Sequence, residues 1–201
     1  MTKNYKSLII LILFALQVVS SWAQKPFVFH NKKFRIAQFT DLHWDAKSPK
    51  CDSTRTTILN ILQREKPDIA ILTGDIVTKK PYEKGWKQII EIFETARTPF
   101  VVTMGNHDAE HFSRDEIYRM LFASKFYSGL PSPKEISGNG NCALPIYDNN
   151  TANAKPKAVL YCIDSNDYQP DKDLGEYDWI HFDQIEWYRR TSEAFTLQNN
   201  K

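Results

Sequence analysis

The fold of this chain is decided by residues 67–75, which read PDIAILTGD. Residues 68–73 are almost wholly apolar, and a strand of this kind is typically buried on both faces, as in a parallel sheet. The preceding segment, 53–65, has apolar side chains at helical spacing, and Pro67 ends it. Residues 82–95, which follow the strand, show the same helical spacing. These patterns predict a buried strand between two helices.

The same alternation extends in both directions from this segment. Strands are predicted over 34–40 and 100–104, and a capping box formed by Ser113 and Glu116 predicts the start of a helix that ends near residue 123. This order predicts an α/β fold, in which a parallel sheet carries helices on its faces. In such sheets the functional crevice lies outside the carboxyl ends of the strands. Two further strands and a last helix are predicted over 142–147, 158–163 and 182–194.

Polar side chains follow three of the predicted strands at these carboxyl ends. They form the motifs D-x-H, G-D and G-N-H-D, which comprise Asp41 and His43, then Gly74 and Asp75, then Gly105, Asn106, His107 and Asp108. Carboxylate, imidazole and amide oxygen groups are metal ligands, and two metals about 3.5–4 Å apart can cleave a phosphate ester. A carboxylate can bridge such a pair, and Asp75 is the candidate. Each motif alone is an ordinary loop sequence, but the three in this order predict a two-metal site.

These motifs resemble the signature of the calcineurin-like metallophosphoesterase superfamily. The likeness continues in residues 34–43, 67–75, 138–141 and 164–168, which look like the branch related to purple acid phosphatases. The resemblance implies a metallophosphoesterase-like β-sandwich flanked by helices, here expected to be the N-terminal portion and incomplete at its C-terminal side. It also implies an exported enzyme that hydrolyses phosphate esters by metal-activated hydroxide.

The resemblance implies a role for each motif residue. Asp41 and His43 are expected to bind the first metal, with Asp75 as the bridge. Asn106 is expected to bind the second metal through its side-chain carbonyl. His107 is expected to be catalytic and to face the substrate, with Asp108 orienting its ring. The implied cofactor is a pair of divalent or mixed-valence metal ions, either Fe, Mn or Zn.

The chain departs from the family pattern at two places. Purple acid phosphatases have a tyrosine three residues after the bridging Asp, and this sequence has Thr78 there. The family completes its second metal site with later histidines, including a Gly-His-x-His motif, whereas this sequence offers His111 and His181 after its third motif. Two alternatives to an active enzyme therefore stay open. The chain could be a catalytically incomplete fragment, or a non-catalytic protein of the same fold that binds metal or phosphate.

The N-terminal residues have the features of a secretory signal peptide. Lys3 and Lys6 precede an apolar run, and Ala23 ends a small-residue cleavage pattern. The apolar run is shorter than the ~20 residues that a membrane-spanning helix needs. We expect a signal peptide over 1–23 and a single phosphoesterase domain over 24–201, which is secreted or periplasmic and has no membrane attachment after cleavage.

Charge and composition narrow the expected partners. The 201 residues include 26 Lys and Arg against 24 Asp and Glu, a formal net charge of +2. Residues 1–23 contain two lysines and no acids, so the mature chain is formally neutral. A neutral chain without a basic run is a poor candidate for binding nucleic acid. The expected substrate is a phosphate-ester small molecule, a phosphoprotein or a phosphodiester.

Three cysteines are present, at Cys51, Cys142 and Cys162. Their spacing contains no C-x-x-C, which argues against a thiolate metal site. In an oxidising compartment one pair could form a disulfide, and the sequence leaves the choice of pair open. Cys162 lies in an apolar strand, where a buried free thiol is the plainer interpretation.

Overall fold

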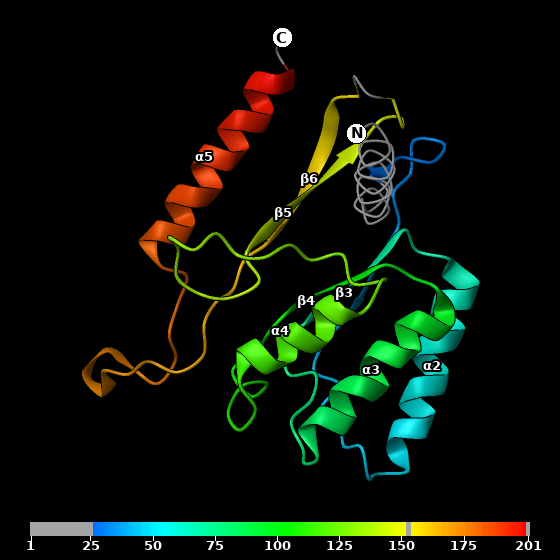
Figure 1. The fold of residues 1–201 in the computed structure, drawn as a ribbon, viewed down its shortest axis with the longest axis vertical. Helices are drawn as coiled ribbons and strands as arrows, with labels where there is room; N and C mark the ends of the chain where they lie inside the picture. The colour runs from blue at the N-terminus through cyan, green and yellow to red at the C-terminus, as the bar shows by residue number, and fades with distance from the viewer. Residues whose placement is uncertain (1–25, 152–153, 200–201) are drawn as a thin grey trace, which may run out of the picture.

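The computed structural model describes residues 26–151 and 154–199 (Figure 1). The predicted signal peptide, residues 1–23, lies outside this described part. Among the described residues, no helix combines the length and the apolar character that crossing a membrane requires.

Three parallel strands form the sheet that the sequence predicts. They are β2 (Ile36–Phe39), β3 (Ile69–Thr73) and β4 (Phe100–Thr103), in the order β2-β3-β4. Residue pairs such as Ala37 with Ala70 and Ala70 with Phe100 fix their register. β3 lies between the other two, which explains its nearly continuous apolar sequence. The strands are slightly shorter than predicted, but their order and parallel pairing are confirmed.

Helices α2 (Lys50–Glu65), α3 (Tyr82–Ala96) and α4 (Arg114–Ala123) follow these strands and lie beside one another (Figure 1). The predicted apolar face of α3 is confirmed, because Trp86, Ile89, Ile90 and Phe93 are all buried. The capping box of Ser113 and Glu116 is also present at the start of α4. α2 begins three residues earlier than predicted, because Pro49 already has helical backbone angles and serves as its N-cap.

A second small sheet lies above helices α2, α3 and α4 in the view of Figure 1. It contains β1 (Phe27–Val28), β5 (Cys142–Tyr147) and β6 (Pro156–Cys162) in the order β1-β5-β6. β1 pairs with β5 in parallel, and β5 pairs with β6 in antiparallel fashion. β1 was not predicted because a two-residue strand is too short to show a hydrophobic periodicity. The architecture is therefore α/β, with two three-stranded sheets flanked by helices.

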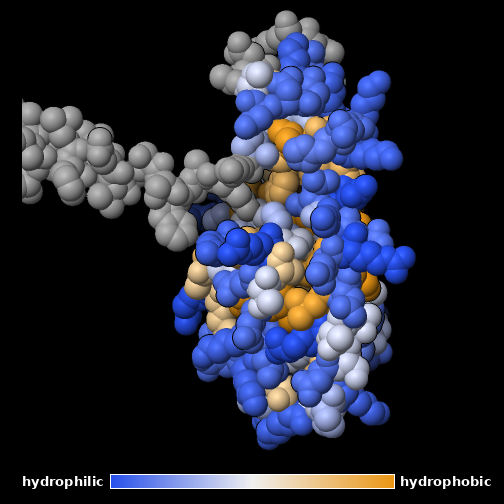
Figure 2. Space-filling model, turned by 90° about the vertical axis from the view of Figure 1, so that its right-hand side faces the viewer, coloured by the Kyte–Doolittle hydropathy of each residue, from blue (hydrophilic) through white to orange (hydrophobic). Residues whose placement is uncertain are grey.

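The C-terminal helix α5 (Phe182–Asn199) packs along β6, and a short 3-10 helix, η1 (Lys172–Leu174), precedes it. The predicted apolar face of α5 is only partly correct. Tyr188 packs its ring edge-on against Tyr161, with ring centroids 4.8 Å apart, but Tyr188 is 41% exposed and Ile185 is 43% exposed. The buried residue of this helix is polar Gln184. Figure 2 shows a largely hydrophilic face on which hydrophobic side chains form small patches.

Candidate metal centre

The three motifs meet at one edge of the β2-β3-β4 sheet, as the sequence predicts. Their loops continue the pairing of the strands. The Asp41 amide donates to the Gly74 carbonyl at 3.0 Å, and the Gly74 amide donates to the Thr103 carbonyl at 2.9 Å. The His43 amide donates to the Asp75 carbonyl at 2.9 Å. These backbone bonds fix the motif residues relative to the strand ends.

Three of the predicted ligands have a backbone conformation that side chains rarely adopt. The φ angles are 50° at Asp41, 43° at His43 and 53° at Asp75. Each left-handed non-glycine residue costs about 1–3 kcal/mol, and such residues cluster at functional sites where the surrounding structure holds them. All three residues predicted to bind the first metal therefore have strained backbone conformations.

Gly105 allows the second and third motifs to approach closely. A Cβ atom at this position would lie 2.3 Å from Asp75 Oδ1 and 2.6 Å from the Asp75 amide nitrogen. No side chain fits at such distances, so glycine is required where the Asp75 carboxylate lies over the third motif. The same carboxylate oxygen accepts a hydrogen bond from the His107 amide at 3.2 Å.

Asp41, His43 and Asp75 form a group of potential metal ligands. One ligand atom from each lies within 4.8 Å of the other two. Ligands bound to one ion at about 2.0–2.2 Å are ~3–4 Å apart, so a small movement of these side chains would let them share an ion. Among the residues that the structure describes, this is the one such group of three or more acidic, histidine or cysteine residues. The donor set fits a divalent metal.

Neighbouring side chains contact two of the three candidate ligands. Thr78 Oγ1 lies 3.3 Å from His43 Nδ1, while His43 Nε2 lies 3.9 Å from Asp41 Oδ1. The Thr40 hydroxyl donates to Asp41 Oδ2 at 2.6 Å. Partners of this kind orient metal ligands and fix the histidine tautomer. Thr78 thus contacts the candidate ligand His43 from the position where purple acid phosphatases have a tyrosine.

Asn106 lies beside the group but has a partner that sequence reasoning did not identify. Its amide nitrogen donates to the hydroxyl of Tyr168 at 2.9 Å. This contact orients the amide, whose oxygen is the atom that could coordinate a second metal. Tyr168 comes from the loop that follows β6, so the second sheet contributes a residue to the centre.

His107 and Asp108 have different partners, contrary to the expected pairing. His107 Nδ1 lies 2.8 Å from Glu110 Oε1, and the Tyr168 hydroxyl donates to the same oxygen at 2.5 Å. These two bonds lower the pKa of Glu110, the Tyr168 bond contributing most. The only signal in the sequence for Glu110 is an acid three residues after His107.

Asp108 instead supports the backbone of the site. Its carboxylate is buried and accepts from the amides of Ile76 at 2.8 Å, Val77 at 3.0 Å and Gly105 at 2.9 Å. Burial raises its pKa, and the three backbone bonds oppose that rise. The expectation that Asp108 orients the His107 ring is therefore corrected, because both its oxygens bind the loops of the second and third motifs.

The two later histidines have partners elsewhere. The exposed ring of His111 lies 5.9 Å from the ring of Tyr82, and His181 Nε2 lies 3.0 Å from an oxygen of Asp178. Neither histidine joins the metal-ligand group within the part of the chain that the structure describes.

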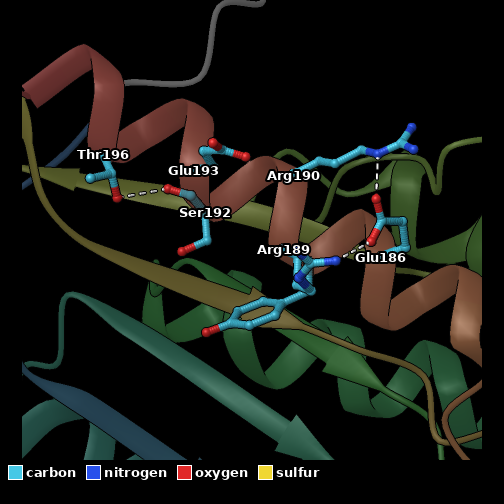
Figure 3. Close-up of a pocket in the computed structure, with 7 residues that line it drawn as sticks. Glu186, Arg189, Arg190, Ser192, Glu193 and Thr196 are labelled. Atoms are coloured by element: carbon cyan, nitrogen blue, oxygen red, sulfur yellow. Dashed lines mark hydrogen bonds and ion pairs between the residues drawn. The ribbon is translucent and has the colours of Figure 1, made fainter.

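A separate hollow of about 460 Å³ lies along α5 (Figure 3). Three of its charged side chains already pair with one another, because Glu186 binds both Arg189 and Arg190 at 2.7 Å. Figure 3 shows these groups on one side of the helix, where Thr196 also bonds back to the Ser192 carbonyl. The hollow contains none of the motif residues, and its paired charges are typical of a solvated helix face.

Comparison with known proteins decides the family. A model of the calcineurin-like phosphoesterase family matches residues 34–198. The chain belongs to this family. This calcineurin-like chain is 29% identical over 194 residues to probable inactive purple acid phosphatase 29 of Arabidopsis thaliana. The matched region covers 85% of the chain and 50% of the relative. It is 27% identical over 185 residues to phosphatase DCR2 of Saccharomyces cerevisiae, which covers 81% of the chain and 32% of that protein.

A second Arabidopsis relative, probable inactive purple acid phosphatase 14, is 26% identical over 202 residues, or 84% of the chain and 49% of the relative. The calcineurin-like chain thus has distant homology to purple acid phosphatase-like proteins over most of its length. It spans between about a third and a half of the length of these relatives.

Proposed function

We propose that this calcineurin-like chain hydrolyses phosphate esters in a metal-dependent reaction. The observation that carries the proposal is the group of Asp41, His43 and Asp75, held in left-handed backbone conformations at the carboxyl edge of a parallel sheet. That edge is where ligands bind in sheets of this type. The family match supports the same chemistry.

In this proposal Asp41, His43 and Asp75 hold one metal, and Asp75 and Asn106 contribute to a second. When bound, divalent or mixed-valence Fe, Mn or Zn ions activate water and neutralise phosphoryl oxygens. Asp75 is suited to a shared position because its loop contacts both neighbouring motifs, through the His43 amide and the His107 amide. Asn106 offers its amide oxygen, with Tyr168 fixing the amide nitrogen.

His107 would act on the substrate. Its ring centroid lies 6.3 Å from that of His43, so the imidazole is beside the candidate metal ligands. Because Glu110 engages Nδ1, Nε2 is left to donate to a phosphoryl oxygen or to the leaving oxygen. We propose His107 as the catalytic residue and Glu110 as its positioning residue. The substrate class is a phosphate monoester or diester on a small molecule or protein.

The test is hydrolysis of a chromogenic phosphate monoester and diester by the purified chain with added Mn²⁺, Zn²⁺ or Fe²⁺. Turnover should require metal and should fall at least about 100-fold in Asp75→Asn, since even outer-shell changes at metal sites cost about 10–100-fold. Asp52→Asn, an exposed acid on α2, is the matched control and should keep its activity. Equal turnover in Asp75→Asn and the unaltered chain would overturn the proposal.

A second candidate is metal or phosphate binding without turnover. It is favoured by His111 and His181, which have partners outside the described ligand group. The names of two matched relatives also describe them as probably inactive. Saturable metal binding by folded chain that hydrolyses neither ester would select this candidate.

We also propose that the chain is exported and functions as a secreted or periplasmic protein. The proposal rests on the lysines and apolar run of residues 1–23. Mass spectrometry of the protein recovered outside the cytoplasm tests this proposal. The measured mass should correspond to a chain that begins just after Ala23. Recovery of uncleaved chain in the cytoplasm alone would contradict it.

A further inference from the structure

Two of the three cysteines face each other in the second sheet. Cys142 is the first residue of β5, Cys162 is the last residue of β6, and the antiparallel register pairs them directly. Directly opposed Cα atoms in such a pair are about 4.5–5.5 Å apart. Disulfides span Cα separations of about 4.4–6.8 Å. The backbone therefore already has the spacing that a disulfide requires.

The third cysteine has a different environment. Cys51 lies on α2, and its sulfur accepts a hydrogen bond from the Asp45 amide at 3.3 Å. Cys142 and Cys162 are both buried free thiols in the second sheet, as expected for Cys162, and their side chains contact each other. We propose that Cys142 and Cys162 form a disulfide that closes the open end of the β5–β6 hairpin. The register thus selects one of the pairings that the sequence leaves open.

The two thiols are placed to form the disulfide by thiol–disulfide exchange. The two side chains are in contact, and this contact lowers the pKa of Cys142 and raises that of Cys162. The Cys142 thiolate attacks a disulfide oxidant, such as oxidised glutathione, to form a mixed disulfide and release one thiol. Cys162 then loses its proton and attacks the Cys142 sulfur, releasing the second thiol. Two protein thiols lose two protons and two electrons, and the oxidant is reduced to two thiols.

The disulfide would hold a buried polar network in place. Asn141 precedes Cys142, and its side-chain oxygen accepts from the Asp164 amide at 2.9 Å. Gln184 of α5 donates to the same oxygen at 3.0 Å and to the Asp164 carbonyl at 2.6 Å. The proposed disulfide would therefore lie beside Asn141 and Asp164, the two residues that Gln184 of α5 binds. Buried networks of this kind depend on every partner remaining in position.

The same network leads to the candidate metal centre. The buried Asp164 carboxylate forms an ion pair with Arg114 at the start of α4. Four residues farther along, Tyr168 reaches Asn106 and Glu110. A disulfide at Cys162 would thus anchor the strand from which the Tyr168 loop departs. The pairing itself does not depend on the proposed hydrolysis, so either proposal can fail without the other.

Peptide mapping tests the pairing directly. The chain is unfolded, fully reduced, refolded in a mixture of reduced and oxidised glutathione, alkylated and digested with trypsin. Trypsin separates the cysteines into residues 51–55, 135–157 and 158–172. The expected product joins 135–157 to 158–172. Its mass should be the sum of the two peptide masses minus two hydrogen atoms. Dithiothreitol should separate it.

Recovery of 135–157 and 158–172 unlinked from refolded chain would overturn the proposal, as would a link from either to 51–55. A stability measurement gives a second readout. Dithiothreitol should lower the thermal unfolding midpoint by about 5–10 °C in the unaltered chain and in Cys51→Ala. It should leave the midpoint of the Cys142→Ala/Cys162→Ala double variant unchanged. An equal effect of dithiothreitol on all three proteins would contradict the disulfide.

Discussion

Glu110 Oε1 lies 2.8 Å from Nδ1 of His107 and so orients the ring of the candidate catalytic histidine. The same oxygen accepts the Tyr168 hydroxyl at 2.5 Å. Glu110 therefore links the third motif to the loop after β6. The motif itself points to Asp108 for this role, but the Asp108 carboxylate is turned inward to three backbone amides.

Replacing Glu110 by Gln should lower kcat by about 10–100-fold with little change in KM, as expected for an outer-shell partner. Glutamine keeps the size and an acceptor oxygen but removes the charge that holds the imidazole. Steady-state kinetics on a phosphate monoester measure the effect. Glu83→Gln, which removes an exposed partner of Lys87 on α3, is the control. Unchanged kcat in Glu110→Gln would remove this residue from the catalytic account.

Replacing Tyr168 by Phe should weaken metal binding and lower kcat by up to about 10-fold, because the hydroxyl that orients Asn106 and Glu110 is lost. Calorimetric titration with Mn²⁺ and steady-state kinetics are the two measurements. Tyr177→Phe is the matched control, since its ring stacks on Tyr168 with centroids 5.9 Å apart. If both variants behaved alike, the Tyr168 hydroxyl would have no role in the centre.

Replacing Asp108 by Ala should destabilise the fold by about 2–4 kcal/mol, since buried amides lose an ionic acceptor. The affected amides belong to Ile76, Val77 and Gly105. Urea unfolding of the metal-free chain measures the loss. Glu110→Ala, which leaves these bonds intact, should cost much less. Equal stability of the two variants would mean that Asp108 does not support the loops.

Asp183 predicts a pH-dependent stability. Its pKa is lowered, chiefly by the hydrogen bond from the Ser137 hydroxyl. A carboxylate with a lowered pKa stabilises the fold above its unfolded pKa of about 3.9, and this contribution is lost as the pH falls. Ser137→Ala should therefore have a lower thermal midpoint than the unaltered chain at about pH 7, and the gap should narrow below about pH 4. A gap that stayed constant with pH would contradict the assignment.

The periodic parts of the fold could be predicted because they depend on local sequence. β3 is apolar throughout since it lies between two parallel strands, and α3 repeats its apolar residues every turn. The position of the three motifs followed from topology, because the carboxyl ends of parallel strands share one edge. The two-residue strand β1 and the polar anchor Gln184 carry no such pattern.

The side-chain partners of the site could not be predicted from local sequence. Asn106 and Tyr168 are 62 residues apart and meet only because the second sheet brings its loop to the first. The choice between Asp108 and Glu110 depends on a turn that directs one carboxylate inward and leaves the other beside His107. The facing of Cys142 and Cys162 likewise depends on strand register rather than on spacing in the chain.

Metal binding tests the central claim most directly. Calorimetric titration of the purified chain with Mn²⁺ should show saturable binding that Asp75→Asn abolishes and that Asp52→Asn retains, because Asp75 contributes to the group with Asp41 and His43. All three proteins should show the same far-ultraviolet circular dichroism. Binding in Asp75→Asn that equals that of the unaltered chain, or none in any folded protein, would contradict the account.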